Sequence, residues 1–192
     1  MATAAATLLS PEEYLALERC APTRSEYHDG KMVALAGASW NHNVVVDNLS
    51  AAINARVSGR SCRAVTSDQK VWSPRTRRFL YPDVVVVCGP PTFHDENRDV
   101  IVNPILVIEV LSVSTEAYDR GEKFRHYQSI PSLLEYVLVD QASIQIESYL
   151  RQGSEFWRYS RLEPGAEALA LTSLSIELPI VEIYRGLSLL NA

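Results

Sequence analysis

Two apolar runs, each carrying one acid, constrain the fold of this chain more than any other feature. Residues 81–87 read Tyr-Pro-Asp-Val-Val-Val-Val, and residues 105–111 read Ile-Leu-Val-Ile-Glu-Val-Leu. Continuous Val, Ile and Leu are typical of strands that are buried on both faces. An ionised carboxylate in such surroundings needs a charged partner, a metal ion or a shifted pKa. Asp83 and Glu109 are therefore candidates for a functional site.

The composition predicts one globular domain spanning residues 1–192. Of these residues 47 % are hydrophobic and 21 % are charged, which favours a single sizeable core over disorder. The net charge of −5 argues against binding nucleic acid by bulk electrostatics, although an acidic total can hide a local basic patch. No apolar run approaches the roughly 18 residues that a membrane span needs, so we expect no membrane partner.

The cysteines indicate the compartment. Cys20, Cys62 and Cys88 are odd in number and form no Cys-x-x-Cys pair. We therefore expect a reduced, cytoplasmic chain without a disulfide or a structural zinc site. The first nine residues lack the basic segment of a signal peptide, which agrees with this expectation.

Capping residues, turn residues and hydrophobic periodicity predict the order of the elements. In chain order we expect a helix at 10–22, a hairpin turning at 29–30, a helix at 39–57, a strand at 61–72, the Asp83 strand, a polar connection at 92–103, the Glu109 strand, a helix ending before 131, a strand at 134–140, a hairpin at 143–160, a strand at 174–178 and a helical turn at 179–187.

This order predicts an α/β or α+β domain with a mixed central sheet. The strand–helix–strand unit at residues 105–140 implies a parallel pair with a right-handed crossover. The Asp83 and Glu109 strands could be antiparallel, because their connection contains no clear helix. Helices would flank the sheet, with one hairpin near the N-terminus and a second hairpin as a C-terminal extension.

Two acids on neighbouring strands with a lysine nearby form a recurrent arrangement for cutting phosphodiesters. Carboxylate oxygens suit Mg²⁺ or Mn²⁺, and a lysine can orient or activate the attacking water. Each residue also has a structural interpretation. Asp83 could be a turn residue at a strand entry, Glu109 could form a buried ion pair, and Lys123 could pair with Asp119 four residues earlier.

Several motifs together resemble the Uma-two family of "putative restriction endonucleases", a branch of the PD-(D/E)XK nuclease superfamily. They are Tyr81-Pro82-Asp83, residues 108–112, residues 114–127 and residues 135–140, with further similarity near residues 12–14, 26–30 and 183–184. The resemblance implies a restriction-endonuclease-like core and a Mg²⁺-dependent endonuclease that hydrolyses DNA. It also admits a homodimer, since nucleases of this superfamily often pair to cut two strands.

The resemblance also implies roles for individual residues. Asp83 and Glu109 would bind Mg²⁺ or Mn²⁺, with the carbonyl of Val110 assisting. The superfamily motif places a lysine two residues after the second acid, where this chain has Leu111. The family shares this departure, and the matching lysine lies on the following helix, at Lys123. Glu26 matches an acid that the N-terminal part contributes.

Other features stay open at this point. Glu26 could instead be a solvated hairpin residue, and His42 fits a core histidine better than a ligand. The basic turn with Arg75, Arg77 and Arg78 could grip phosphates or could simply be solvated. The alternative to a nuclease is a non-enzymatic binding or assembly module with the nuclease fold, which the acidic net charge and the lack of a separate DNA-reading domain motivate.

Overall fold

The computed structural model of the protein describes residues 8–66, 68–154 and 156–191 of the chain. Its strands form a five-stranded sheet, a six-stranded sheet and a two-stranded sheet. The five-stranded sheet has the order β2 (Lys31–Ala34), β1 (Ser25–His28), β5 (Arg78–Leu80), β4 (Lys70–Ser73), β7 (Val100–Ile101). The six-stranded sheet has the order β11 (Phe156–Arg161), β10 (Ile146–Gln152), β9 (Glu135–Asp140), β8 (Leu106–Leu111), β6 (Val84–Cys88), β3 (Cys62–Thr66). The third sheet pairs β12 (Ala168–Leu171) with β13 (Ile176–Pro179).

The first two helices begin at serine caps. In α1 (Pro11–Glu18) the Ser10 hydroxyl accepts from the Glu13 amide and the Glu13 carboxylate accepts from the Ser10 amide, which forms a capping box. In α2 (Trp40–Arg56) the Ser39 hydroxyl caps the first turn. The remaining helical elements are α3 (Glu116–Tyr118), a π-helical turn at Asp119–Lys123, α4 (Phe124–Gln128), α5 (Ile180–Ile183) and two short 3₁₀ turns, Thr172–Leu174 and Ser188–Asn191. No helix in the described ranges is long and apolar enough to cross a membrane.

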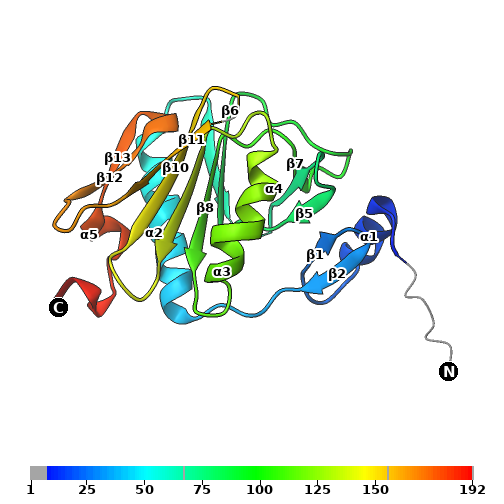
Figure 1. The fold of residues 1–192 in the computed structure, drawn as a ribbon, viewed down its shortest axis with the longest axis horizontal. Coiled ribbons are helices and arrows are strands. Elements are labelled where there is room, and N and C mark those ends of the chain that lie inside the picture. The colour runs from blue at the N-terminus through cyan, green and yellow to red at the C-terminus, as the bar shows by residue number, and fades with distance from the viewer. Residues whose placement is uncertain (1–7, 67, 155, 192) are drawn as a thin grey trace.

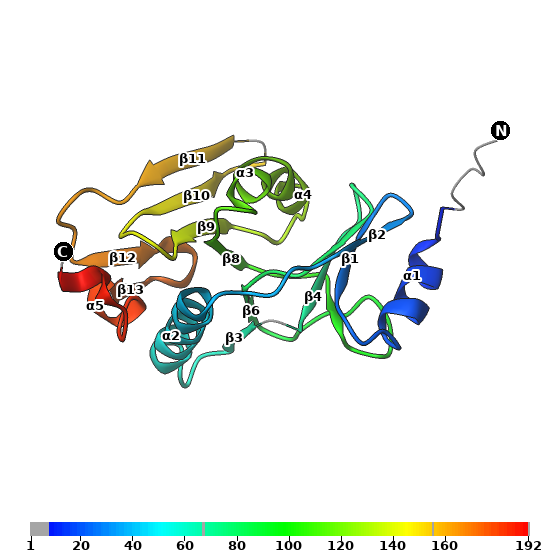
Figure 2. The same ribbon diagram turned by 90° about the horizontal axis from the view of Figure 1, so that it is seen from below.

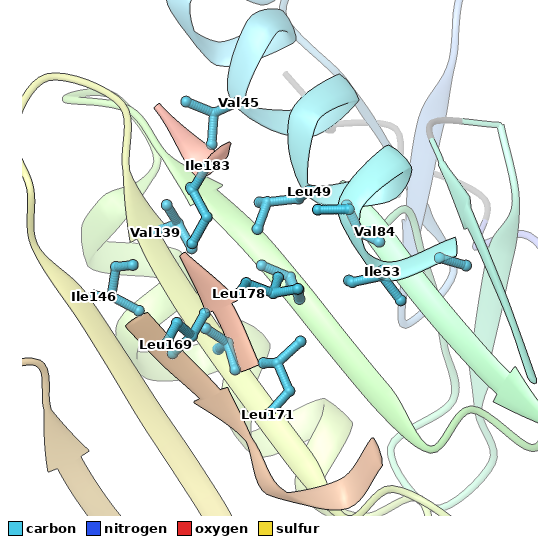
Figure 3. Packing of buried hydrophobic residues seen from close by; sticks show 14 of the residues in the cluster. Val45, Leu49, Ile53, Val84, Val139, Ile146, Leu169, Leu171, Leu178 and Ile183 are labelled. Atoms are coloured by element: carbon cyan, nitrogen blue, oxygen red, sulfur yellow. The ribbon is translucent and has the colours of Figure 1, made fainter. Parts of the chain in front are cut away.

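Strands β6, β8 and β9 of the six-stranded sheet are buried on both faces, as the continuous apolar runs predict, and helical segments cover the sheet (Figures 1 and 2). Helix α2 and the α3–α4 segment cover opposite faces of this sheet (Figure 2). Val84 and Ile108 belong to the core under α2, where α5 and the β12–β13 pair also pack (Figure 3). Val85 and Val107 belong to the core on the α4 side. Side chains therefore alternate between two cores along each strand.

Most of the expected topology is confirmed. Strand β8 pairs with β6 in the antiparallel sense and with β9 in the parallel sense, so the central sheet is mixed. The β1–β2 and β10–β11 hairpins also form. The expected single strand at 61–72 is wrong, because β3 and β4 belong to different sheets. The connection at 92–103 also contains a strand that sequence reasoning missed, β7.

The expectation of no disulfide is wrong. Cys62 on β3 and Cys88 on β6 are register partners in the antiparallel pair, and they form a disulfide. They are 26 residues apart in sequence, and the chain between them makes β4 and β5 of the other sheet, so their spacing gives no hint of the pairing. Cys20 is an exposed free thiol. A cytoplasmic location stays a prediction.

The segment Tyr81-Pro82-Asp83 joins the two large sheets. It leaves β5 of the five-stranded sheet and enters β6 of the six-stranded sheet. The end of β8 and the start of α2 lie close to this junction (Figure 1). The two candidate acids therefore reach the same end of the central sheet.

Candidate active site

A pocket of about 370 Å³ opens at the junction of the two sheets. Its walls come from β1, the connection at 35–39, the first turn of α2, the Tyr81–Asp83 junction, the end of β8 and the α3 region. All four side chains that the sequence proposes for the site line this pocket: Glu26, Asp83, Glu109 and Lys123. The fold therefore brings together residues from four separate parts of the chain.

Glu109 and Lys123 form a buried ion pair at the base of the pocket. Glu109 alternates with Val110 along β8 and so points to the α4 side of the sheet, the same side as Leu111. The π-helical turn packs on that side and directs Lys123 inward. The distance from Lys123 Nζ to Glu109 Oε1 is 2.9 Å, and the two side chains are only 8 % and 2 % exposed. A lysine from the next helix thus reaches the acid, as the resemblance implies.

Glu26 is buried on the other side of the lysine. Its Oε1 lies 3.6 Å from Lys123 Nζ and accepts a hydrogen bond of 3.0 Å from the Tyr81 amide. Its Oε2 lies 3.0 Å from His28 Nε2 and accepts from the Tyr118 hydroxyl at 3.3 Å. The solvated-hairpin interpretation is therefore wrong, because this carboxylate is buried and is held by β1, by the junction between the sheets and by the α3 region.

Asp83 lies nearer the mouth of the pocket, with its side chain 24 % exposed. Its Oδ2 accepts a hydrogen bond of 2.7 Å from the Val110 amide, which ties the start of β6 to the end of β8. The same oxygen lies 3.1 Å from Nε2 of His42 in the first turn of α2. His42 is thus more than a core histidine, because its side chain lines the pocket and contacts a candidate acid.

Asp119 was missed as a site residue. It is buried, lines the pocket and lies 3.7 Å from Lys123 Nζ. The i,i+4 pair that was the structural alternative for Lys123 therefore exists, but it lies inside the site and not in solvent. Both residues belong to the π-helical turn, an irregularity that frequently marks functional positions.

The electrostatics follow from one lysine shared among several acids. Burial raises the pKa of Glu109 well above its usual range, and the charges of Asp83 and Asp119 add to this effect while Lys123 opposes it. Burial alone would lower the pKa of Lys123, but Glu109, Glu26 and Asp119 outweigh it and raise this pKa well above normal. The lysine therefore stays protonated, and the acidic side chains that share the site outnumber it.

The donor set fits a hard divalent cation. Carboxylate oxygens are the ligands that Mg²⁺ and Mn²⁺ prefer. Glu26, Asp83, Glu109 and Asp119 share the pocket with one buried lysine, so carboxylate oxygens are available to an added cation. Over the described residues, no three His, Cys, Asp or Glu side chains gather around one metal position. Two protein carboxylates with several waters, the usual shell of Mg²⁺ in proteins, match this arrangement best.

The basic turn does not contribute to the pocket. Arg78 is buried and its guanidinium lies 3.0 Å from the Asp29 carboxylate, so it is not free to grip a phosphate. Arg75 and Arg77 are exposed on the β4–β5 turn, and they do not line the pocket. Their proposed phosphate contact stays a prediction.

Comparisons with known proteins agree with the motifs. The family model Uma2, described as "Putative restriction endonuclease", matches residues 11–180. The Synechocystis protein slr1290 is 38 % identical over 180 residues, which cover 94 % of this chain and 93 % of that protein. The Synechocystis protein sll1609 is 36 % identical over 162 residues, covering 84 % and 92 % respectively.

A solved structure shares the fold. It is the crystal structure of a "putative nuclease belonging to DUF820" from Anabaena variabilis, with a TM-score of 0.73 and 20 % sequence identity. The match covers 90 % of this chain and 96 % of that one. The restriction-endonuclease-like core expected from the sequence is therefore the observed fold. The family model spans the pocket and both acid strands, and the chain belongs to the Uma2 family of "putative restriction endonucleases".

Proposed function

We propose that this protein is a divalent-metal-dependent endonuclease that hydrolyses DNA phosphodiester bonds. The observation that carries the proposal is the convergence of Glu26, Asp83, Glu109 and Lys123 on one pocket. Membership of the Uma2 family supports the same class of activity.

In this proposal Asp83 and Glu109 hold Mg²⁺ or Mn²⁺. The carbonyl of Val110 is a third ligand candidate. The Val110 amide donates to Asp83. Because the N–H and C=O of one strand residue point to the same side of the strand, the Val110 carbonyl also faces the side on which Asp83 lies. When bound, the cation supplies Lewis acidity, which lowers the pKa of water and neutralises charge that develops on the phosphate.

Lys123 positions the attacking water. Its ammonium group is fixed by Glu109 and by the Tyr81 carbonyl, which accepts a hydrogen bond of 3.2 Å from Nζ. Because the surrounding acids keep this lysine protonated, it acts by donating hydrogen bonds and by stabilising negative charge.

Glu26 serves as a further acceptor for water or as an outer ligand. Burial opposes its ionisation, but Lys123, His28 and the Tyr81 amide outweigh burial and lower its pKa. Glu26 is therefore ionised at neutral pH and can accept a hydrogen bond from a water molecule beside Lys123.

The test is cleavage of DNA by purified wild-type protein and by two variants, with Mg²⁺ or Mn²⁺ present. Asp83→Ala and Glu109→Gln should each abolish metal-dependent cutting, because each removes one of two carboxylate ligands. Glu116→Gln is a matched control, since Glu116 is an exposed acid on α3 outside the pocket lining. Undiminished cutting by Asp83→Ala and Glu109→Gln would refute the assignment.

A specific observation favours the second candidate, a non-enzymatic binding or assembly module. Lys123 already pairs with Glu26, Glu109 and Asp119, so the buried acids have a cationic partner without any metal. Calorimetry with Mn²⁺ separates the two candidates. The module predicts no Mn²⁺ binding and no cleavage of single-stranded, duplex or branched DNA.

A further inference from the structure

Two exposed apolar side chains are sequence neighbours of residues that line the pocket. Trp40, the first residue of α2, is 76 % exposed, and Val113, in the turn after β8, is 98 % exposed. Their sequence neighbours Ser39, Ser112 and Ser114 line the pocket. Among the described residues no aromatic ring stacks on Trp40, so fold packing does not account for this large side chain.

Hydrogen bonds connect the two segments that carry Trp40 and Val113. The Ser39 hydroxyl donates to the Gln141 side chain, and Gln141 Nε2 donates to the Leu111 carbonyl at 3.0 Å. The start of α2 and the end of β8 are thereby linked through one residue. Trp40 therefore extends from a fixed backbone next to the entrance of the site.

The depth of the site restricts what can enter. Glu109 and Lys123 are 2 % and 8 % exposed, so a phosphate must leave the body of its nucleic acid and enter the pocket to reach them. A duplex holds its phosphates along a stiff, regular helix, whereas a single strand bends freely. The buried position of the acids thus favours an unpaired segment.

Because few basic side chains line the pocket, stacking of bases on an aromatic ring matters more for binding than contacts with phosphates. Arg24 and Lys123 are the only basic Lys or Arg side chains among the described residues that line it, and Lys123 is already paired with acids. The chain carries a net charge of −5. Affinity for the phosphate backbone is therefore weak, whereas stacking of a base on an aromatic ring depends little on charge.

We propose that the site takes an unpaired stretch of nucleic acid, in which Trp40 stacks on the base next to the phosphate that enters the pocket. Val113 contacts the strand on the other side of the entrance. This inference rests on the proposed function and defines its substrate class as single strands, flaps and splayed ends. A blunt duplex is a poor ligand.

Tryptophan fluorescence tests the proposal without cleavage. The full-length protein is titrated in Ca²⁺, first with an oligothymidylate and then with a blunt hairpin duplex of equal nucleotide count. The oligothymidylate should quench the fluorescence and bind more tightly than the duplex. Trp40→Ala should lose the quenching and weaken oligothymidylate binding about tenfold, whereas Trp40→Phe should keep most of the affinity.

Phe156→Ala is the matched control. Phe156 is an aromatic residue of similar exposure, 74 %, on edge strand β11, which does not line the pocket. This variant should bind like the wild type. Equal affinity for duplex and single strand, or unchanged binding by Trp40→Ala, would overturn the inference.

The two proposals fail in different ways. If Trp40→Ala binds normally while Asp83→Ala loses cleavage, the stacking inference is wrong and the nuclease stands. If Trp40-dependent binding of single strands is observed while Asp83→Ala still cuts, the stacking site is upheld and the nuclease assignment is wrong.

Discussion

Replacing Lys123 by methionine should destabilise the fold far more than replacing Glu109 by glutamine. The site contains one buried lysine within 4 Å of three carboxylates, at 2.9 Å for Glu109, 3.6 Å for Glu26 and 3.7 Å for Asp119. Among the described residues, Lys123 is the only lysine or arginine within 4 Å of these three acids, so Lys123→Met leaves all three without that partner. Glu109→Gln removes one of the acids and leaves the lysine with two partners.

The magnitudes follow from the cost of unpaired buried charge. Removing one partner of a buried ion pair typically lowers the free energy of unfolding by about 3–5 kcal/mol, because the remaining charge is left unpaired in the low-dielectric interior. Methionine keeps the volume of the lysine stem, so packing loss adds little. Glu109→Gln replaces a fully buried acid whose pKa burial raises, so its free energy of unfolding should stay within about 1 kcal/mol of wild type or increase.

Urea unfolding of metal-free protein, followed by far-ultraviolet circular dichroism, measures both values. The m-values of wild type and variants should agree, which shows that the same surface is exposed on unfolding. The double variant Glu109→Gln with Lys123→Met should recover part of the stability that Lys123→Met loses, since it leaves fewer unpaired acids. A Glu109→Gln variant that loses as much stability as Lys123→Met would refute the shared-cation account.

Two further predictions concern regions outside the pocket. Burial and the charge of Arg78 lower the pKa of His126, so the stability gained from neutral His126 is complete above about pH 6.5 and is lost as the pH falls through the folded-state pKa. His126→Gln should flatten this part of the stability–pH curve, and parallel curves for both proteins would contradict it. Titration of the denatured, unreduced protein should find one free thiol, Cys20, because Cys62 and Cys88 are paired. Three thiols before reduction would contradict the pairing.

The middle of the central sheet was predictable because β6, β8 and β9 are apolar on both faces. Runs such as residues 84–87 and 105–108 have few alternatives to a doubly covered strand, and the helix before Pro131 supplies the crossover for a parallel pair. The position of Lys123 was implied by the family resemblance, and it agrees with a helix that follows β8 and packs on the face to which Glu109 points. A homodimer stays a prediction.

Other parts of the site depend on contacts between distant segments. His42 reaches Asp83 across 41 residues of sequence, and Glu26 reaches the Tyr81 amide across 55. Neither contact leaves a periodic or spacing signal. Asp119 did have a signal, its i,i+4 spacing from Lys123, but the same spacing is common on solvated helix surfaces. The burial of Asp119 distinguishes a site residue from a residue on a solvated helix surface. That burial depends on how the helical segment packs against the sheet.

The central claim is that Asp83 and Glu109 together hold a divalent cation. A crystal of the full-length protein soaked in Mn²⁺, with anomalous diffraction measured, tests this claim most directly. The expected result is one strong anomalous peak bound by a carboxylate oxygen from each residue, with Lys123 beside it. A soaked crystal in which this position holds no manganese, with Lys123 still paired to Glu109, would contradict the claim.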